Sequence, residues 1–174
     1  VIPTLTLSPD VTSSLAPVEV SAGVVGQWDD ARTFIAEYTV TDAEVDVDAV
    51  SIDVSGAKDV AGNVQATYTT ETEFNIDTLN PSATCSSEII APNLTDGVSS
   101  DADRIVEYTV DFSEPVQSVV AEDISVTGGR LLTVPQLNAE GTQAVFRVEA
   151  TDNSEVPLVV SVLGTVKDLN GNAL

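Results

Sequence analysis

The sequence KDVAGN at Lys58–Asn63 recurs as KDLNGN at Lys167–Asn172, and both copies follow a run in which valine alternates with other residues. The interval from Lys58 to Lys167 is the size of a domain, which indicates an internal repeat. Asp and Asn hydrogen-bond to nearby backbone groups and Gly adopts positive φ at little cost, so each copy predicts a tight turn after a strand. Whether the turn also binds a metal ion decides the functional interpretation.

Alternation of apolar and other residues dominates the chain, and no helical stripe exceeds two turns, so the sequence predicts an all-β protein. The strands expected in the first half are Thr4–Ser8, Pro17–Ser21, Thr33–Val40, Ala49–Val54 and a long last strand Val64–Ile76, with Tyr68, Phe74 and Ile76 pointing inward. Those expected in the second half are Ala83–Ile90, Ile105–Phe112, Val116–Val126, Leu131–Leu137, Thr142–Ala150 and Val156–Leu163. This spacing predicts tandem immunoglobulin-like antiparallel β-sandwiches.

The expected domain boundary is Ile76–Pro81, because Pro81 cannot donate to a strand ladder and holds Asn80 extended. The modules are then residues 1–79 and 80–174. Nothing in module one matches Ala83–Glu114, so we expect it to lack its first strands, and module two to lack its last strand. Either the sequence is a fragment whose ends fall inside repeats, or another chain completes the open edges by strand addition.

Composition excludes several classes of function. The chain carries 28 acidic and 6 basic residues, for a net charge of −22, yet 43% of it is hydrophobic, so the charge is expected on a folded surface. Such a surface repels nucleic acid and anionic lipid, and no apolar run approaches the roughly 20 residues of a membrane span. With no histidine and a single cysteine, Cys85, the chain has no Ser-His-Asp site, Cys-His site or internal disulfide, and we expect no enzyme.

Four features together resemble one known family. They are Phe112–Val116 (FSEPV), the segment Trp28–Tyr38, the Asp-x-x-Gly-Asn turns, and Ile76–Thr78 followed by Pro81. Over nearly the whole chain they resemble the bacterial immunoglobulin-like repeats of very large surface adhesins. The resemblance implies extracellular extender modules on the bacterial cell surface, often stiffened by Ca²⁺ between domains. Their partners would be neighbouring repeats of the same chain, with the ligand of the adhesive tip bound elsewhere.

Strand alternation independently predicts a cation site. In a sandwich, the loops after strands two, four and six lie at the end where the linker enters. In module two these loops are Ser113–Glu114, Asn138–Glu140 and Asp168–Asn172, while module one offers the loop Asp42–Asp48. Their oxygen donors suit Ca²⁺. The candidate ligands are Asp77, Asn80, Glu114, Asp168, Asn172, Asp42 and Asp46. The alternative is that they are only turn and surface residues.

Two further groups of residues are weaker candidates. A second cation site, shared with a following repeat, would use Asp96, Asp101, Asp103, Asp152 and Glu155. The lone Trp28 is expected as a core plug or end cap, because it stands beside an aromatic strand. Only 5% of the chain is aromatic, which argues against a stacking-based sugar site. The sequence therefore predicts a structural extender stiffened by calcium at the junction. The alternative is a glycan- or peptide-binding β-sandwich module of a secreted protein or enzyme, for which Trp28 would be exposed.

Overall fold

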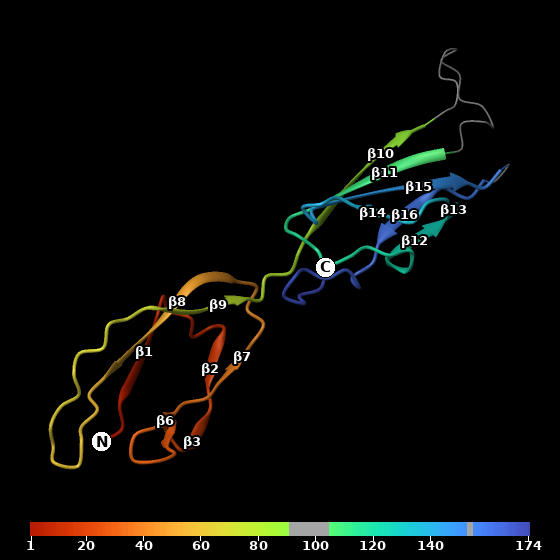
Figure 1. The fold of residues 1–174 in the computed structure, drawn as a ribbon. Helices are drawn as coiled ribbons and strands as arrows, with labels where there is room; N and C mark the ends of the chain where they lie inside the picture. Colours follow the sequence, from red (N-terminus) through yellow and green to blue (C-terminus); the bar gives the residue numbers. More distant parts are fainter. Residues whose placement is uncertain (91–104, 153–154) are drawn as a thin grey trace. The chain divides into compact units, whose positions relative to one another are not determined.

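The chain forms two compact units, Val1–Leu79 and Asn80–Leu174. The computed structural model describes residues 1–90, 105–152 and 155–174. Within these ranges every strand pair is antiparallel and the one helical element is the 3₁₀ turn Ala121–Asp123, which confirms the all-β class (Figure 1). None of the described residues belongs to a helix long and apolar enough to span a membrane.

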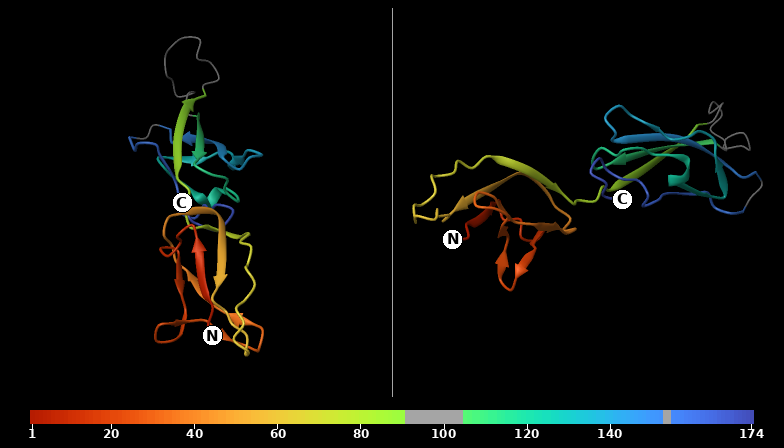
Figure 2. Two further views of the ribbon diagram at one scale, coloured as in Figure 1. Left: turned by 90° about the vertical axis from the view of Figure 1, so that its left-hand side faces the viewer. Right: turned by 60° about the horizontal axis from the view of Figure 1, so that its bottom comes forward.

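Unit 1 contains a three-stranded sheet and three two-stranded ribbons. The sheet has the order β1-β8-β9, with strands β1 (Thr4–Ser8), β8 (Asp46–Ser55) and β9 (Thr72–Asp77). The ribbons are β2 (Leu15–Pro17) with β7 (Tyr38–Val40), β3 (Glu19–Ser21) with β4 (Val24–Val25), and β5 (Gln27–Trp28) with β6 (Phe34–Ile35). In the right-hand view of Figure 2 the ribbons, in red and orange, lie below β8 and β9.

The core of unit 1 is small. It consists of Val11, Leu15, Val50 and Ile76, with Leu7, Tyr38, Val47 and Phe74 packed against it. Leu15 comes from the β2-β7 ribbon, whereas Val50 and Ile76 come from the three-stranded sheet. The two layers therefore face each other across a shared apolar interior, as in a β-sandwich.

Unit 2 has one large and one small sheet. The large sheet has the order β10-β11-β15-β13, and β14 also pairs with β15. Its strands are β10 (Ala83–Ile89), β11 (Ile105–Phe112), β13 (Gly129–Leu131), β14 (Gln136–Leu137) and β15 (Gln143–Ala150). The small sheet pairs β12 (Ile124–Thr127) with β16 (Val159–Val162). Figure 1 shows β12 and β16 as a layer separate from β10, β11 and β15.

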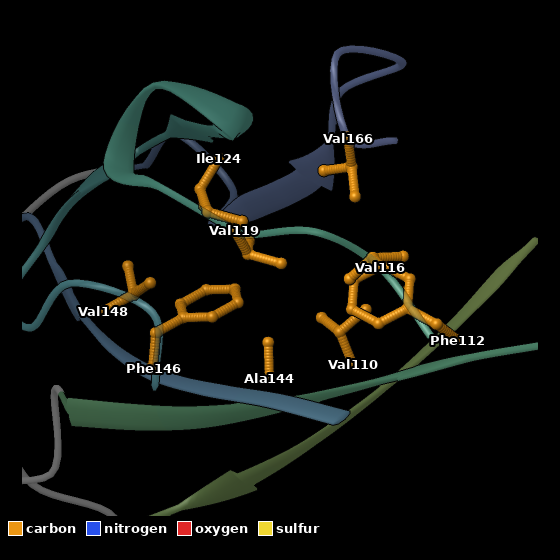
Figure 3. Packing of buried hydrophobic residues seen from close by; sticks show 9 residues of the cluster. All are labelled: Val110, Phe112, Val116, Val119, Ile124, Ala144, Phe146, Val148 and Val166. Atoms are coloured by element: carbon orange, nitrogen blue, oxygen red, sulfur yellow. The ribbon is translucent and has the colours of Figure 1, made fainter. Parts of the chain in front are cut away.

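The core of unit 2 lies between these two layers (Figure 3). Its buried members are Val110, Phe112, Val116, Val119, Ile124, Ala144, Phe146, Val148 and Val166. The Phe146 side chain, 1% exposed, occupies the interior, and its ring stacks on Tyr108 with centroids 5.6 Å apart. Tyr108, Val110 and Phe112 pack on one side of β11, as the period-two pattern predicts.

The two units repeat the same pairing register. In unit 1, Gln27 pairs with Ile35 and Trp28 with Phe34. In unit 2, Gln136 pairs with Val145 and Leu137 with Ala144, and to within one position the shift equals that from Lys58 to Lys167. Three further pairs correspond in order: Leu15–Val40, Ala16–Thr39 and Pro17–Tyr38 match Gly129–Ala150, Arg130–Glu149 and Leu131–Val148. To within one position the same shift relates β7 to β15, whereas β2 and β13 are related by a longer shift of 114 residues (129 − 15). The repeat marked by the two turns therefore extends through the strands that precede them.

Several strand predictions were wrong in extent. The long last strand of the first half is only Thr72–Asp77, and Tyr68 is 40% exposed rather than inward-facing. Thr-rich runs favour strands only where a neighbour pairs with them, and before Thr72 the run contributes only the isolated bridge from Val64 to Lys58. The expected strand Thr33–Val40 is divided into β6 and β7, and the expected strand Pro17–Ser21 is divided between β2 and β3. The predicted loop Asp42–Asp48 is partly strand, because β8 begins at Asp46.

Candidate functional site

The Asp168 side chain organises the second copy of the repeated turn. Its Oδ1 atom accepts hydrogen bonds from the backbone N–H groups of Asn170, Gly171 and Asn172, and its Oδ2 atom accepts one from the Asn172 side chain at 2.8 Å. Gly171 has a φ of +100°, which a residue with a side chain rarely adopts. The turn predicted from Asp, Gly and Asn is confirmed.

Asp59 builds the first copy in the same way. Its carboxylate accepts the backbone N–H and the side-chain N–H of Asn63, both at 2.8 Å, and Gly62 has a φ of +91°. The environments of the two carboxylates differ. Asp168 is 1% exposed, whereas Asp59 lies on the surface. The same local motif is therefore solvated in unit 1 and part of the packed structure in unit 2.

Both turns stabilise the ionised carboxylate. For Asp168, burial disfavours the charge, but the hydrogen bonds from Asn172, Gly171 and Asn170 outweigh it, and the pKa lies below its usual value of 3.8. For Asp59, the side chain and backbone of Asn63 lower the pKa in the same direction. Each Asp is therefore an anion at neutral pH. The Oδ2 atom of Asp168 accepts the Asn172 amide, and its second lone pair gives it capacity for a cation.

Three loops of unit 2 meet at one end of the sandwich. Val116 donates its N–H to the carbonyl of Gly141, Gln117 donates to the carbonyl of Lys167, both at 2.9 Å, and Val116 forms a bridge with Asp168. The predicted convergence of these loops is confirmed. Ligand oxygens of Glu114 and Asp168 lie within 4.8 Å of each other. These two carboxylates, from loops far apart in the sequence, form the acidic pair of unit 2.

The start of unit 2 is tied to the same corner. The Ser82 N–H donates to the Ser113 hydroxyl, and the Ser113 N–H donates back to the Ser82 carbonyl, both at 2.9 Å. Ser113 immediately precedes Glu114, and Asn80 lies just before Ser82, with Pro81 between them. The candidate ligand Asn80 is therefore held near Glu114 by the chain itself. Asn138, in the third loop, accepts the N–H groups of Thr142 and Gln143 and serves as a turn residue.

Unit 1 has its own acidic pair. Asp46 is the strand partner of Asp77 in the β8-β9 ladder, so the two side chains lie on the same face of the sheet. The next residue, Thr78, is buried, and its hydroxyl accepts the N–H groups of Ala43 and Val45 at 3.3 and 3.2 Å. These bonds attach the loop before β8 to the end of β9. Asp42, in that loop, is exposed and accepts the N–H of Glu44 at 3.3 Å.

Only part of the second predicted cation site lies within the described residues. Asp96, Asp101 and Asp103 lie outside the described residues. Asp152 and Glu155, at the far end of β15, are exposed. This site remains a prediction.

Trp28 is not a core residue. It is 42% exposed and packs edge-on against Phe34, with ring centroids 5.5 Å apart and planes at 72°. It borders a surface cavity of about 370 Å³ that Arg32, Lys58, Asp59 and Asn63 also line. The core-plug interpretation of Trp28 was wrong, because its segment forms the short β5-β6 ribbon at the surface of the unit. This cavity was not predicted from sequence, although the lone Trp was a signal for it.

Cys85 is a strand residue, as expected. It belongs to β10, opposite Val110 in the ladder, and is a free cysteine. Partial burial and the nearby Asp111 raise the pKa of its thiol. A protonated thiol is a poor nucleophile, so Cys85 is not an activated group.

Comparison of the chain with protein-family models, with curated proteins and with solved structures gives no significant match.

Proposed function

We propose that the chain is a pair of tandem immunoglobulin-like modules that extends a bacterial cell-surface adhesin, with no catalytic role. The observation that carries the proposal is the strand order. The order β10-β11-β15-β13 opposite β12-β16 matches strands A-B-E-D opposite C and F of an immunoglobulin sandwich. In unit 1, β1-β8-β9 matches C-F-G, and β2-β7 matches D-E.

The shared register supports a tandem repeat rather than two unrelated domains. The pairing of β5 with β6 recurs in β14 with β15, and β7 recurs as part of β15, with nearly the same shift that relates the two Asp-x-x-Gly-Asn turns. The pairing of β2 with β7 recurs in β13 with β15, although β13 follows β2 by a longer shift of 114 residues (129 − 15). Modules that repeat in this way add length to a protein one unit at a time. Neighbouring repeats of the same chain are then the natural partners, and the acidic surface suits an extracellular setting that supplies divalent cations.

Calcium at the junction is the second part of the proposal. The hard oxygen donors of the acidic pair Glu114 and Asp168 fit Ca²⁺, as do the amide oxygens of Asn80 and Asn172. Asp77 is close to Asn80 in the chain, and the intervening segment spans at most about 10 Å, so its carboxylate is within reach of that corner. Asp46 is the strand partner of Asp77, and Asp42 lies in the loop attached to Thr78. Bound calcium would relieve repulsion among these carboxylates.

Small-angle scattering and thermal unfolding test the junction directly. With millimolar Ca²⁺, the range typical of extracellular sites, we expect a higher melting temperature and a narrower distribution of interunit distances than with chelator. Mg²⁺ at the same concentration should have less effect, because it demands a smaller octahedral site.

Glu114→Gln is the decisive variant, because it keeps the shape of the side chain and removes the charge. It should abolish the calcium response, whereas Glu140→Gln, at an exposed acid of a neighbouring loop, should retain it. Unchanged scattering and melting of the parent chain with Ca²⁺ would overturn the calcium mechanism, while the repeat architecture would stand.

The alternative function, a ligand-binding module, is favoured by the exposure of Trp28. An exposed aromatic ring beside Arg32, Asp59 and Asn63 offers both a stacking surface and hydrogen-bonding groups for a sugar. Titration of glycans monitored by Trp28 fluorescence tests this function. Saturable quenching that is lost in an Arg32→Ala variant with unchanged thermal unfolding would support it, and the absence of quenching across neutral and acidic glycans would remove it.

A further inference from the structure

The surface cavity beside Trp28 lies between two turns of unit 1. One is the turn of the β5-β6 ribbon, residues 29–33, and the other is the first copy of the repeated turn, residues 58–63, at the same end of the unit (Figure 1). The cavity has a volume of about 370 Å³. Ligand pockets in proteins run from roughly 300 to 1,000 Å³, so this cavity suits a small ligand.

Hydrogen bonds within each turn fix the walls of the cavity. In the β5-β6 turn, Asp30 Oδ1 accepts the backbone N–H groups of Arg32 and Thr33 at 2.6 and 2.8 Å. At the base of the second turn, the Gln65 N–H donates to the Ala57 carbonyl at 3.0 Å, and Gln65 Oε1 accepts the Ala57 N–H at 2.9 Å. A ligand would therefore meet walls that are already ordered, which lowers the entropic cost of binding.

The cavity gathers the positive charge of unit 1. Arg32 and Lys58 are the only basic residues of the unit, where acidic residues far outnumber them, and both line the cavity. Among the residues that the structure describes, which include all of unit 1, neither forms an ion pair, whereas Arg130 and Arg147 of unit 2 each pair with a glutamate. In a chain of net charge −22, two basic side chains that share a cavity without a carboxylate partner favour an anionic ligand.

The acidic residues of the two turns are bound within those turns. The Oδ2 atom of Asp30 accepts the Thr33 hydroxyl, and the Asp59 carboxylate accepts two N–H groups of Asn63. For Asp30, the N–H of Arg32 and then that of Thr33 lower the pKa of the carboxyl. For Asp59, the side chain and backbone of Asn63 lower it. Neither carboxylate forms an ion pair with the two basic side chains, whose own N–H donors remain for a ligand.

Trp28 adds a flat apolar surface to these charges. It is 42% exposed, and Phe34 packs against it edge-on. A simple inorganic anion would gain nothing from an aromatic surface, whereas a sugar ring has C–H groups that pack on an indole. The hydroxyl groups of a sugar would also find the amide of Asn63, which lines the same cavity. Trp28 therefore favours a sugar as the part of the ligand that carries the anionic group.

The corresponding loop of unit 2 has the opposite charge. By the shared register, Leu137 stands where Trp28 does. The loop that follows it, residues 138–142, contains the acidic Glu140 and no basic residue. The carboxylates at this end of unit 2 suit a cation, whereas the guanidinium, ammonium and indole groups of unit 1 suit an anion.

The acidity of the whole chain limits the charge of that anion. A polyanion would meet repulsion from the surrounding carboxylates, and a phosphate dianion would be repelled more strongly than a carboxylate, because the energy scales with the charge. A carboxylate also matches the planar guanidinium of Arg32, with which it can form two parallel hydrogen bonds. A single carboxylate group is therefore the anion that the site accepts best.

We propose that the cavity beside Trp28 binds a sugar residue that carries one carboxylate group, such as a uronic acid. The carboxylate pairs with Arg32 and Lys58, and the sugar ring packs on Trp28. The proposal rests on the ligand-binding alternative given above and narrows its ligand to one chemical class. It requires no calcium.

Two matched sugars test the ligand class. Methyl β-D-glucuronide differs from methyl β-D-glucoside only by a carboxylate in place of a hydroxymethyl group. Each is titrated into the full chain with chelator present, and the fluorescence of Trp28, the only tryptophan, reports binding. The glucuronide should bind about three- to five-fold more tightly at low salt, given typical energies of exposed ion pairs, and added salt should reduce this preference. Acetate, which has the carboxylate but no ring, should bind more weakly than the glucuronide.

Variants of the chain locate the site. Arg32→Gln keeps a polar side chain but removes the charge, and it should lose most of the preference for the glucuronide. Arg130→Gln, at an exposed arginine of unit 2, is the matched control and should retain it. Trp28→Leu introduces the residue that unit 2 has at this position and should weaken binding of both sugars, measured by saturation-transfer NMR of the ligand. Thermal unfolding checks that each variant is folded.

The possible failures are distinguishable. Equal affinity for the two sugars would overturn the carboxylate preference, while the ligand-binding alternative would stand. Acetate that binds as tightly as the glucuronide would show a site for simple carboxylates and overturn the sugar. A glucuronide preference that is unchanged in Arg32→Gln would place the binding elsewhere and also overturn the proposal. If none of the three compounds alters the fluorescence or shows saturation transfer, both the proposal and the ligand-binding alternative are wrong.

Discussion

Units 1 and 2 share a strand-pairing register and a side-chain-bonded turn, yet they differ in what those elements bury. Phe146 is 1% exposed and its ring stacks on Tyr108 of the neighbouring strand β11, while the corresponding β6-β7 face lines an open groove. Asp168 is 1% exposed between loops, while Asp59 lies at the surface. Local sequence therefore determines how the strands pair, whereas the burial of their side chains depends on strands contributed from elsewhere in the chain.

The largest expected difference between the units is in their cores. Phe146→Ala should lower the free energy of unfolding of unit 2 by about 3–5 kcal/mol, through lost apolar burial and a residual cavity. Phe34→Ala, at a half-buried position, should cost unit 1 about 1 kcal/mol. Amide hydrogen exchange in β11 and β15 measures the unfolding of unit 2, and Trp28 fluorescence measures the unfolding of unit 1. Equal losses would show that the groove is closed in solution.

The two repeated turns should differ in how much their Asp side chains stabilise each unit. Asp168→Ala leaves three backbone N–H groups and the Asn172 amide without their acceptor, and should destabilise unit 2 by about 1–3 kcal/mol. Asp59→Ala should cost unit 1 less, because water replaces the lost acceptor at the surface. Urea unfolding monitored by hydrogen exchange measures both losses. A larger effect at Asp59 would contradict the importance assigned to burial.

The pH dependence of unit 2 follows from the lowered pKa of Asp168. The ionised carboxylate stabilises the fold above the unfolded-state pKa of about 3.9, and this contribution is lost as pH falls through the lower folded-state value. Asp168→Asn should therefore flatten the acid limb of the unit 2 stability curve, measured by chemical denaturation between about pH 5 and pH 2. An unchanged acid limb would mean that other carboxylates determine it.

The smallest expected effect is at the acidic pair of unit 1. Asp46→Asn removes like-charge repulsion with Asp77 across the β8-β9 ladder and should stabilise unit 1 by a few tenths of a kcal/mol without calcium. Asp48→Asn, also exposed on β8, is the matched control and should have less effect. Salt should reduce the difference, because it screens exposed charges. A destabilised Asp46→Asn variant in chelator would contradict the repulsion.

Part of the candidate site followed from local chemistry. The Asp168–Asn172 turn was predictable because its hydrogen bonds join residues that are close neighbours in the chain. The convergence of the loops at Glu114, Gly141 and Asp168 was predictable from strand alternation alone. The start of β8 at Asp46 was not predictable, because the Asp-rich segment is polar and forms a strand only through its pairing with β9.

Trp28 and Tyr68 show why side-chain exposure was harder to predict. Both belong to segments with strand-like composition, and both are at least 40% exposed. Alternation identifies two faces of a strand, but a face is buried only if a second layer covers it. The segment before Thr72 has one bridging partner, at Val64, and β5-β6 is a two-stranded ribbon.

The sequence by itself determined the all-β class, the domain-sized repeat marked by Lys58 and Lys167, and the turn geometry, because these depend on residues close in the chain or on direct comparison of its two halves. Only the tertiary structure decided that Asp46 pairs with Asp77, that Asp168 is buried and Asp59 is not, and that the face of Phe34, Ala36 and Tyr38 remains partly open. These properties depend on contacts between distant segments, whose geometry no local pattern encodes.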